Sequence, residues 1–257
     1  MVSSLTANEI EKRVDDMSKS YESCFVKGQG KIVPVEYIQQ FYEIHGNIDM
    51  YYGNMYCPEC KKAELSFTHK TRERRAFFSK KKTSMHTSMC SFNFEYASRE
   101  EIIEYVRCVK NVKDRLESVL NMLNNYEVKD DGITDDAESV SRNPFVIINR
   151  GGRVRRCIPR KSLWGDISGL ENKLMIYYGE GILENIRKNG YYQLRIKPSK
   201  GHGNVFHVSR KNKLEGIENG KVYRIALLGE LAKHEDKFRN NYKIIIKPEN
   251  AVAYRYV

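Results

Sequence analysis

The segment that organises this chain begins with Tyr56-Cys57-Pro58-Glu59-Cys60 and ends with His86-Thr87-Ser88-Met89-Cys90. Two cysteines separated by two residues can point both thiolates at one cation, and a histidine four positions before a cysteine can share a helical turn with it. Three cysteines and one histidine are a common closed, tetrahedral ligand set for zinc. We therefore predict a zinc finger over residues 57–90, with the ligands Cys57, Cys60, His86 and Cys90.

Two alternatives to this ligand set stay open at the sequence level. His69 could replace His86 as the fourth ligand, or the cysteines could be small apolar side chains of a core. Cysteines that flank Pro58 at a turn are poor candidates for a core, which favours the metal. Four protein ligands leave no position for a reactive water, so the ion is expected to be structural.

Positive charge is concentrated in two parts of the chain. The net charge is +11 over 257 residues; residues 57–90 carry nine basic and three acidic side chains, and residues 143–257 carry 23 and 10. Such a distribution suits a polyanionic partner and predicts binding to DNA or RNA.

The location of the protein is inferred from its cysteines and its apolar segments. The six cysteines are unevenly spaced and do not resemble a disulfide framework, which favours a reducing, cytoplasmic environment. The first residues lack the basic and apolar regions of a secretory signal, and no apolar run approaches the roughly 18 residues of a membrane span, so neither secretion nor a membrane partner is expected.

The first half of the chain reads as helical. Thr6 and Glu9 form a candidate capping box before an apolar repeat that reaches Tyr21, and a second helix is predicted over residues 35–45, ended by Gly46. Residues 1–126 are therefore predicted to be a helical domain that contains the zinc finger.

A third helix is predicted over residues 98–124. Ser98 and Glu101 form a second capping box, and an apolar stripe follows at Ile102, Val106, Val109, Leu116, Leu120 and Leu123. We expect this stripe to pack on the N-terminal helices; a protein partner that docks on it is the alternative.

Residues 127–142 are acidic and lack periodicity, which predicts a flexible linker and a domain boundary. An alternative is that this segment folds back onto a basic surface of the protein.

The remainder, residues 143–257, reads as short strands. Segments 145–150 and 153–158 flank Gly151-Gly152 as a hairpin, 174–178 is a buried strand, a helical turn is expected over 183–188, and 191–197 alternates between apolar and polar residues. Further strands are predicted at 205–208, 222–228, 242–247 and 251–257. The fold class is thus α+β: a helical N-terminal part with an inserted zinc finger, then a small antiparallel β-barrel of the oligonucleotide-binding (OB) type.

Cations and aromatics mark the candidate nucleic-acid contacts. Arginine forks and lysine charges suit phosphate oxygens, and aromatic rings can stack on unpaired bases. Phe77 and Phe78 could stack in this way, although a role in the finger's own core is favoured. The predicted contacts are Arg72, Arg74, Arg75, Lys80, Lys81, Lys82, Arg153, Arg155, Arg156, Tyr191, Arg195 and Lys197.

The finger segment resembles the N-terminal zinc finger of CoiA-type competence proteins. The resemblance covers about 35 residues and rests on Cys57-Pro58-Glu59-Cys60, the Ala-x-Leu sequence that follows, and the later His86 and Cys90. It implies a zinc finger and a bacterial or phage DNA context. The His-Phe-Ala-His segment of that family is replaced by Ala76-Phe-Phe-Ser79, and its nuclease motif is not found, so the resemblance implies no activity.

Three functions compete on this basis. The first is a zinc-containing nucleic-acid-binding protein without a catalytic centre of its own. The second is a subunit of a bacterial or phage assembly, for anti-phage defence or for a mobile element, in which the finger and the 98–124 helix contact other proteins. The third is a metal-dependent nuclease, for which His202 and His207 are the only hints and no carboxylate cluster accompanies them.

Overall fold

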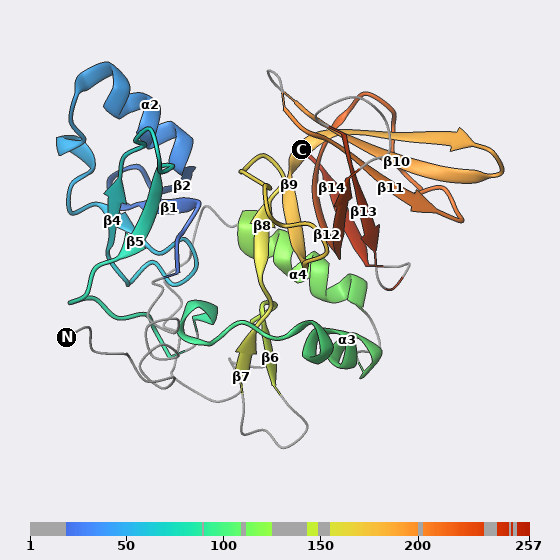
Figure 1. Ribbon diagram of the computed structural model, residues 1–257, viewed down its shortest axis with the longest axis horizontal. Coiled ribbons are helices and arrows are strands. Elements are labelled where there is room, and N and C mark those ends of the chain that lie inside the picture. The colour runs from blue at the N-terminus through green and yellow to red at the C-terminus, as the bar shows by residue number, and fades with distance from the viewer. Residues whose placement is uncertain are drawn as a thin grey trace, which may run out of the picture. The chain divides into compact units, whose positions relative to one another are not determined.

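A computed structural model describes residues 19–88, 90–108, 112–124, 143–148, 155–199, 203–233, 241–246, 248 and 251–257 (Figure 1). The chain is a mixed α+β protein of two compact units, residues 1–92 and 93–257. The predicted linker at 127–142 lies outside the described residues and stays a prediction. The two units are described separately below.

In its described residues, the first unit is built of short antiparallel strands and the α-helix α2 (Val35–His45). The sheets are ordered β2-β1-β3 and β4-β5. Their strands are β1 (Ser23–Val26), β2 (Lys31–Pro34), β3 (Met55–Tyr56), β4 (Leu65–Thr68) and β5 (Phe77–Lys80). Single 3-10 turns follow at η1 (Lys27–Gln29), η2 (Asp49–Tyr51) and, at the boundary of the units, η3 (Ser91–Asn93).

The prediction of a helical N-terminal part is therefore wrong for the described residues, although α2 has the predicted bounds. It ends before Gly46, whose φ of 74° is the left-handed conformation that closes many helices. The sequence feature that indicates a hairpin here is Gly28-Gln29-Gly30. It forms the turn between β1 and β2, with Gly30 at a φ of 63°. The helix predicted from Thr6 lies almost wholly outside the described residues, and its last residue, Tyr21, pairs as an isolated bridge with Phe78.

The core of the first unit surrounds the predicted metal ligands. Cys57 and Cys90 are buried in the same cluster as Tyr21, Ile38 and Phe78. The ligands thus lie inside the unit rather than on a separate finger, and both sheets and α2 contribute to their surroundings.

The second unit contains a closed five-stranded barrel with the strand order β9-β10-β11-β13-β12 and a return to β9. This is the Greek-key order of an OB-like barrel. The strands are β9 (Leu174–Lys188), β10 (Tyr191–Pro198), β11 (Val205–Arg210), β12 (Val222–Lys233) and β13 (Asn241–Ile246). All barrel pairs are antiparallel except β11–β13, which is parallel, so the expectation of a wholly antiparallel barrel is wrong there. Two further strands extend the sheet: β14 (Val252–Tyr256) beside β12 and β8 (Arg160–Ser162) beside β9.

Strand β9 closes the barrel because it pairs with β12 along its first part and with β10 along its second. The two pairings overlap at Gly181 and Ile182. A Cβ atom on Gly181 would lie 2.5 Å from the carbonyl oxygen of Lys197 and 2.7 Å from the ring of Trp164. The indole Nε1 of Trp164 donates a 2.8 Å hydrogen bond to the carbonyl oxygen of Glu180. The helical turn predicted over 183–188 is wrong, because this segment continues the strand.

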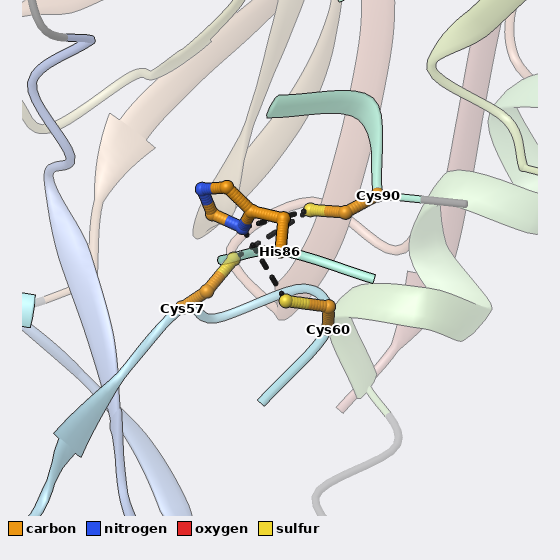
Figure 2. Close-up of side chains that lie close together, drawn as sticks. All are labelled: Cys57, Cys60, His86 and Cys90. Carbon is orange, nitrogen blue, oxygen red and sulfur yellow. Dashed lines mark hydrogen bonds between the residues drawn. The ribbon is translucent and has the colours of Figure 1, made fainter. Parts of the chain in front are cut away.

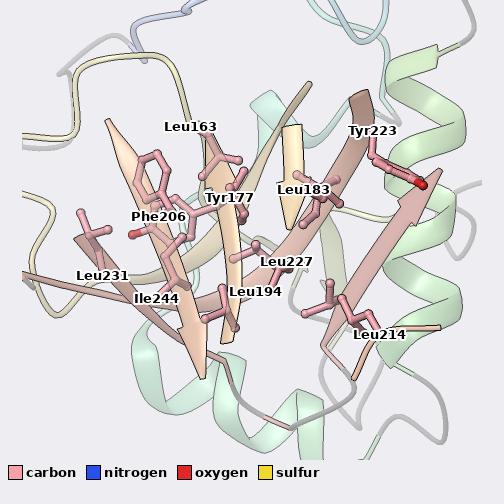
Figure 3. Packing of buried hydrophobic residues seen from close by; sticks show 14 of the residues in the cluster. Leu163, Tyr177, Leu183, Leu194, Phe206, Leu214, Tyr223, Leu227, Leu231 and Ile244 are labelled. Atoms are coloured by element: carbon pink, nitrogen blue, oxygen red, sulfur yellow. The ribbon is translucent and has the colours of Figure 1, made fainter. Parts of the chain in front are cut away.

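Alternation along the strands separates two apolar layers. One set of side chains fills the barrel (Figure 3), including Tyr177, Leu194, Phe206 and Leu227. The neighbouring side chains of β9, β12 and β14 point outward and are covered by α3 (Arg99–Cys108), α4 (Val112–Asn124) and the pair β6 (Val146–Ile148) and β7 (Arg155–Cys157). The β6–β7 pair agrees with the predicted hairpin, whose turn lies outside the described residues.

The helix predicted over 98–124 appears as two helices, α3 and α4. Residues 109–111 lie outside the described residues. Its capping box is confirmed: the Glu101 amide donates to Ser98 Oγ at 3.2 Å, and the Ser98 amide donates to Glu101 Oε2 at 2.7 Å. The described residues of the apolar stripe pack against the barrel, with α4 on β12 and β14, whereas packing on the N-terminal helices was expected. Ile102, Leu116 and Leu120 are buried in this layer. The alternative of a protein partner on the 98–124 helix stays a prediction.

Candidate metal centre and charged surfaces

The four predicted ligands converge on one point (Figure 2). Cys57 Sγ lies 3.8 Å from Cys90 Sγ, and His86 Nδ1 lies 3.4 Å from Cys60 Sγ and 3.3 Å from Cys90 Sγ. Sulfurs at about 2.3 Å from a tetrahedral zinc are about 3.8 Å from each other and about 3.6 Å from a nitrogen ligand. The arrangement therefore fits a tetrahedral metal ion, and the sulfurs are too far apart for disulfides.

His86, and not His69, belongs to this set. The ring of His69 is stacked on Tyr42 with the centroids 4.7 Å apart. The alternative that the cysteines are core side chains is correct in part. Cys57 and Cys90 are buried, but their sulfurs also face the other two ligands.

The first ligand pair is held by a turn. The Cys57 amide donates to the Ala63 carbonyl at 2.7 Å, and the Lys61 amide donates to the Cys57 carbonyl at 3.0 Å. Lys61 has a φ of 54°, an uncommon conformation for a residue with a Cβ. Its amino group lies 4.5 Å from the centre of the Phe25 ring, and burial lowers the pKa of this lysine.

Two contacts around the ligands were not predicted. The carboxylate of Glu59 accepts from the amide and the hydroxyl of Ser91, both at 2.6 Å, and so ties the first cysteine pair to the residue after Cys90. Tyr21 Oη lies 2.7 Å from His86 Nε2, which leaves Nδ1 directed at the sulfurs. Such outer contacts orient metal ligands in known sites. The position of Glu59 between the two cysteines could have indicated its contact from the sequence. No residue near Tyr21 in the sequence indicates its contact with His86.

The sulfurs differ in their affinity for protons. Burial raises the pKa of Cys57, and hydrogen bonds with Cys57 and Cys60 raise the pKa of Cys90. Hydrogen bonds from Cys57 and Cys90 lower the pKa of Cys60. A cation bound by all three sulfurs would displace the protons that the thiols hold.

The basic residues predicted in the first unit lie in two different settings. Arg72, Arg74, Arg75 and Lys82 are exposed. Lys80 instead donates to the Ser84 carbonyl at 2.8 Å, and Lys81 is paired with Glu64. Of the two aromatics, Phe78 is buried in the core, as favoured from the sequence.

The predicted arginines near β7 are partly occupied by protein groups. Arg156 pairs with Glu95 at 2.6 Å and lies 3.7 Å from Glu101. The guanidinium of Arg155 lies 5.9 Å from the centre of the Phe94 ring. Arg153 lies outside the described residues.

Strand β10 carries the remaining predicted contacts. Leu194 and Ile196 point into the barrel and Arg195 and Lys197 point out, as the alternation predicted. Both cations bind one carboxylate, that of Glu184 on β9, with Arg195 Nε at 2.7 Å and Lys197 Nζ at 2.8 Å. Burial alone would raise the pKa of Glu184, but the hydrogen bonds from Lys197 and Arg195 hold it below its usual range.

Comparisons with protein-family models, with curated proteins and with solved structures found no match to this chain. Within the described part of the chain, no helix is long and apolar enough to cross a membrane. Any function must therefore be argued from the geometry of the two units.

Proposed function

We propose that the protein binds single-stranded nucleic acid through the outer face of β10 and β11, and that a structural Zn²⁺ ion stabilises its first unit. The observation that carries the proposal is the OB-like strand order of the barrel, together with Tyr191, Arg195 and Lys197 on the outer side of β10 and His207 beside Arg195 on β11. Barrels of this type bind oligonucleotides on that face and on the loop between the first two strands.

The outer face has the composition that such binding requires. Strand register places Arg195, His207 and Lys243 side by side on β10, β11 and β13. Further along β9 and β10, the turn that joins them carries the exposed Lys188 opposite Tyr191 and the exposed Arg187 opposite Tyr192. Cations along a groove and aromatic rings that stack on bases are the usual elements of single-strand binding.

The opposite wall of the barrel supports the same assignment. Helix α4 packs on β12 and β14, so that wall is an internal layer of the unit. A ligand bound along the barrel surface would therefore contact the β10–β11 side. The proposal assigns binding and no chemical step.

Zinc is proposed because of the donors. Thiolates are soft ligands and imidazole is a borderline one, so both favour zinc over magnesium or calcium, and four ligands close the tetrahedron. The ion would hold residues 57–60 against residues 86–90 and so fix the core of the first unit.

The test uses Glu184, which neutralises part of the proposed face. Glu184→Gln removes the negative charge shared by Arg195 and Lys197, so affinity for a fluorescent single-stranded oligonucleotide should rise by about 3- to 10-fold at low salt. Arg187→Glu/Lys188→Glu should lower that affinity by at least about 10-fold. Lys113→Glu/Lys173→Glu, with the same change of net charge on α4 and at the start of β9, is the matched control.

Fluorescence anisotropy against a salt series, with single-stranded DNA, single-stranded RNA and duplex probes, measures these effects. Absence of salt-dependent binding by the unaltered protein would refute the proposal. Equal losses in the Arg187/Lys188 variant and its control would refute the assignment to this face.

A further inference from the structure

The loop between β4 and β5, residues 69–76, is a concentrated cationic surface of the first unit. It contains four basic residues and one acidic residue, Glu73. The basic side chains are all exposed: Lys70, Arg72, Arg74 and Arg75. In the part of the chain that the structure describes, no carboxylate forms an ion pair with Lys70 or Arg72.

The backbone of this loop is fixed. The Thr71 amide donates to the Arg74 carbonyl at 2.7 Å, and the Arg74 amide donates to Thr71 Oγ1 at 3.1 Å. The Lys70 amide donates to Gln39 Oε1 at 2.8 Å, which attaches the loop to helix α2. A loop whose conformation is already set loses less entropy when it binds, so its charges act at defined positions.

The aromatic side chains beside the loop are already engaged. His69 is stacked on Tyr42 with an interplanar angle of 16°. The guanidinium of Arg74 lies 5.5 Å from the centre of the Phe77 ring, and Phe78 is buried. One face of His69 and one face of Phe77 are therefore occupied by protein groups, and what the loop presents outward is mainly charge.

We infer that residues 69–76 form a second nucleic-acid contact, which binds phosphate groups of the backbone and does not distinguish bases. The inference rests on the proposed function, because it assigns a second surface for the same ligand. Phosphate contacts by lysine and arginine release counterions, and each one adds about 0.7 to the log–log salt slope for single strands and about 0.9 for duplexes.

An anionic membrane would attract the same charges. Surface binding to lipid also requires apolar side chains that enter the acyl region. Residues 69–76 contain no large apolar side chain, which favours nucleic acid over a membrane.

The experiment compares Lys70→Gln/Arg72→Gln with Lys27→Gln/Lys31→Gln in the full chain. The control pair lies on the exposed β1–β2 hairpin of the same unit and removes the same charge. Anisotropy is measured with oligo-dT and oligo-dA of about 30 nucleotides from about 50 to 300 mM salt. The Lys70/Arg72 variant should lower the slope by about 1.4 and the low-salt affinity by roughly 10- to 100-fold on both probes. The control variant should match the unaltered protein.

The possible failures are distinct. An unchanged slope in the Lys70/Arg72 variant, with binding by the unaltered protein intact, overturns the loop assignment and leaves the barrel proposal standing. Absence of binding by the unaltered protein overturns both. A variant that loses binding to phosphatidylserine vesicles but keeps its oligonucleotide affinity assigns the loop to lipid and overturns the inference.

Discussion

At the scale of single residues, the sequence was most informative where spacing constrains chemistry. Cys57, Cys60, His86 and Cys90 were found from their intervals, because ligands of one ion must approach one another whatever the fold around them. The supporting contacts were not accessible in this way. Tyr21 reaches His86 only because its backbone pairs with Phe78, a contact that depends on the folded sheet.

Replacing Glu59 tests whether these supporting contacts matter. Glu59→Gln weakens the paired hydrogen bonds from Ser91 and should reduce zinc affinity by about 10- to 100-fold, the usual effect of losing an outer contact. Competition with a chromophoric chelator measures the affinity, and circular dichroism at saturating zinc should be unchanged. Glu43→Gln is the control, because among the described residues the hydrogen-bond partner of the Glu43 carboxylate is Gln39 on α2. Equal zinc affinity in all three proteins would contradict the role of Glu59.

At the scale of elements, the sequence predicted what local patterns encode. Helix α2, the Ser98–Glu101 capping box and the alternation of β10 all follow from residues close in the chain. The continuation of β9 through residues 183–188 does not, because those residues are extended by pairing with β10. The element on which the 98–124 stripe packs was also predicted incorrectly. An apolar stripe indicates that another element covers it but does not identify that element.

The close approach at Gly181 supplies a test of how β9 closes the barrel. Gly181→Ala places a Cβ against the Lys197 carbonyl and the Trp164 ring, and such overpacking should cost about 1–3 kcal/mol. The melting temperature of the second unit should then fall by roughly 2–12 °C in calorimetry. Gly203→Ala is the control, since its Cβ would meet nothing nearer than Pro198 Cγ at 3.3 Å. If both variants melt like the unaltered protein, the strand is not constrained at this position.

At the scale of the whole molecule, each unit has a core of its own. The first is centred on the ligand cluster, and the second on the barrel with its outer helical layer. The sequence predicted two parts and a barrel, but the described residues 99–124 belong with the barrel, which only the packing could reveal.

This division predicts that metal removal acts on one unit alone. Cys57→Ser, or a strong zinc chelator, should abolish the thermal transition of the first unit, since the binding energy of a structural zinc is folding energy. The transition of the second unit should move by less than about 2 °C. Calorimetry with elemental analysis measures both, and the chelator should have no further effect on the variant. Zinc content that is the same in Cys57→Ser and the unaltered protein would show that the ligand set is wrong.

The packing of α4 on β14 has a consequence for biosynthesis. Residues 112–124 leave the ribosome well before residues 252–256, so the apolar stripe of the helix has no complete docking surface during most of translation. A nascent chain at this stage is a natural client for chaperones that shield apolar segments. The first unit has no such delay. The residues that surround its ligand cluster lie between Tyr21 and Phe92, so all of them are synthesised before the second unit.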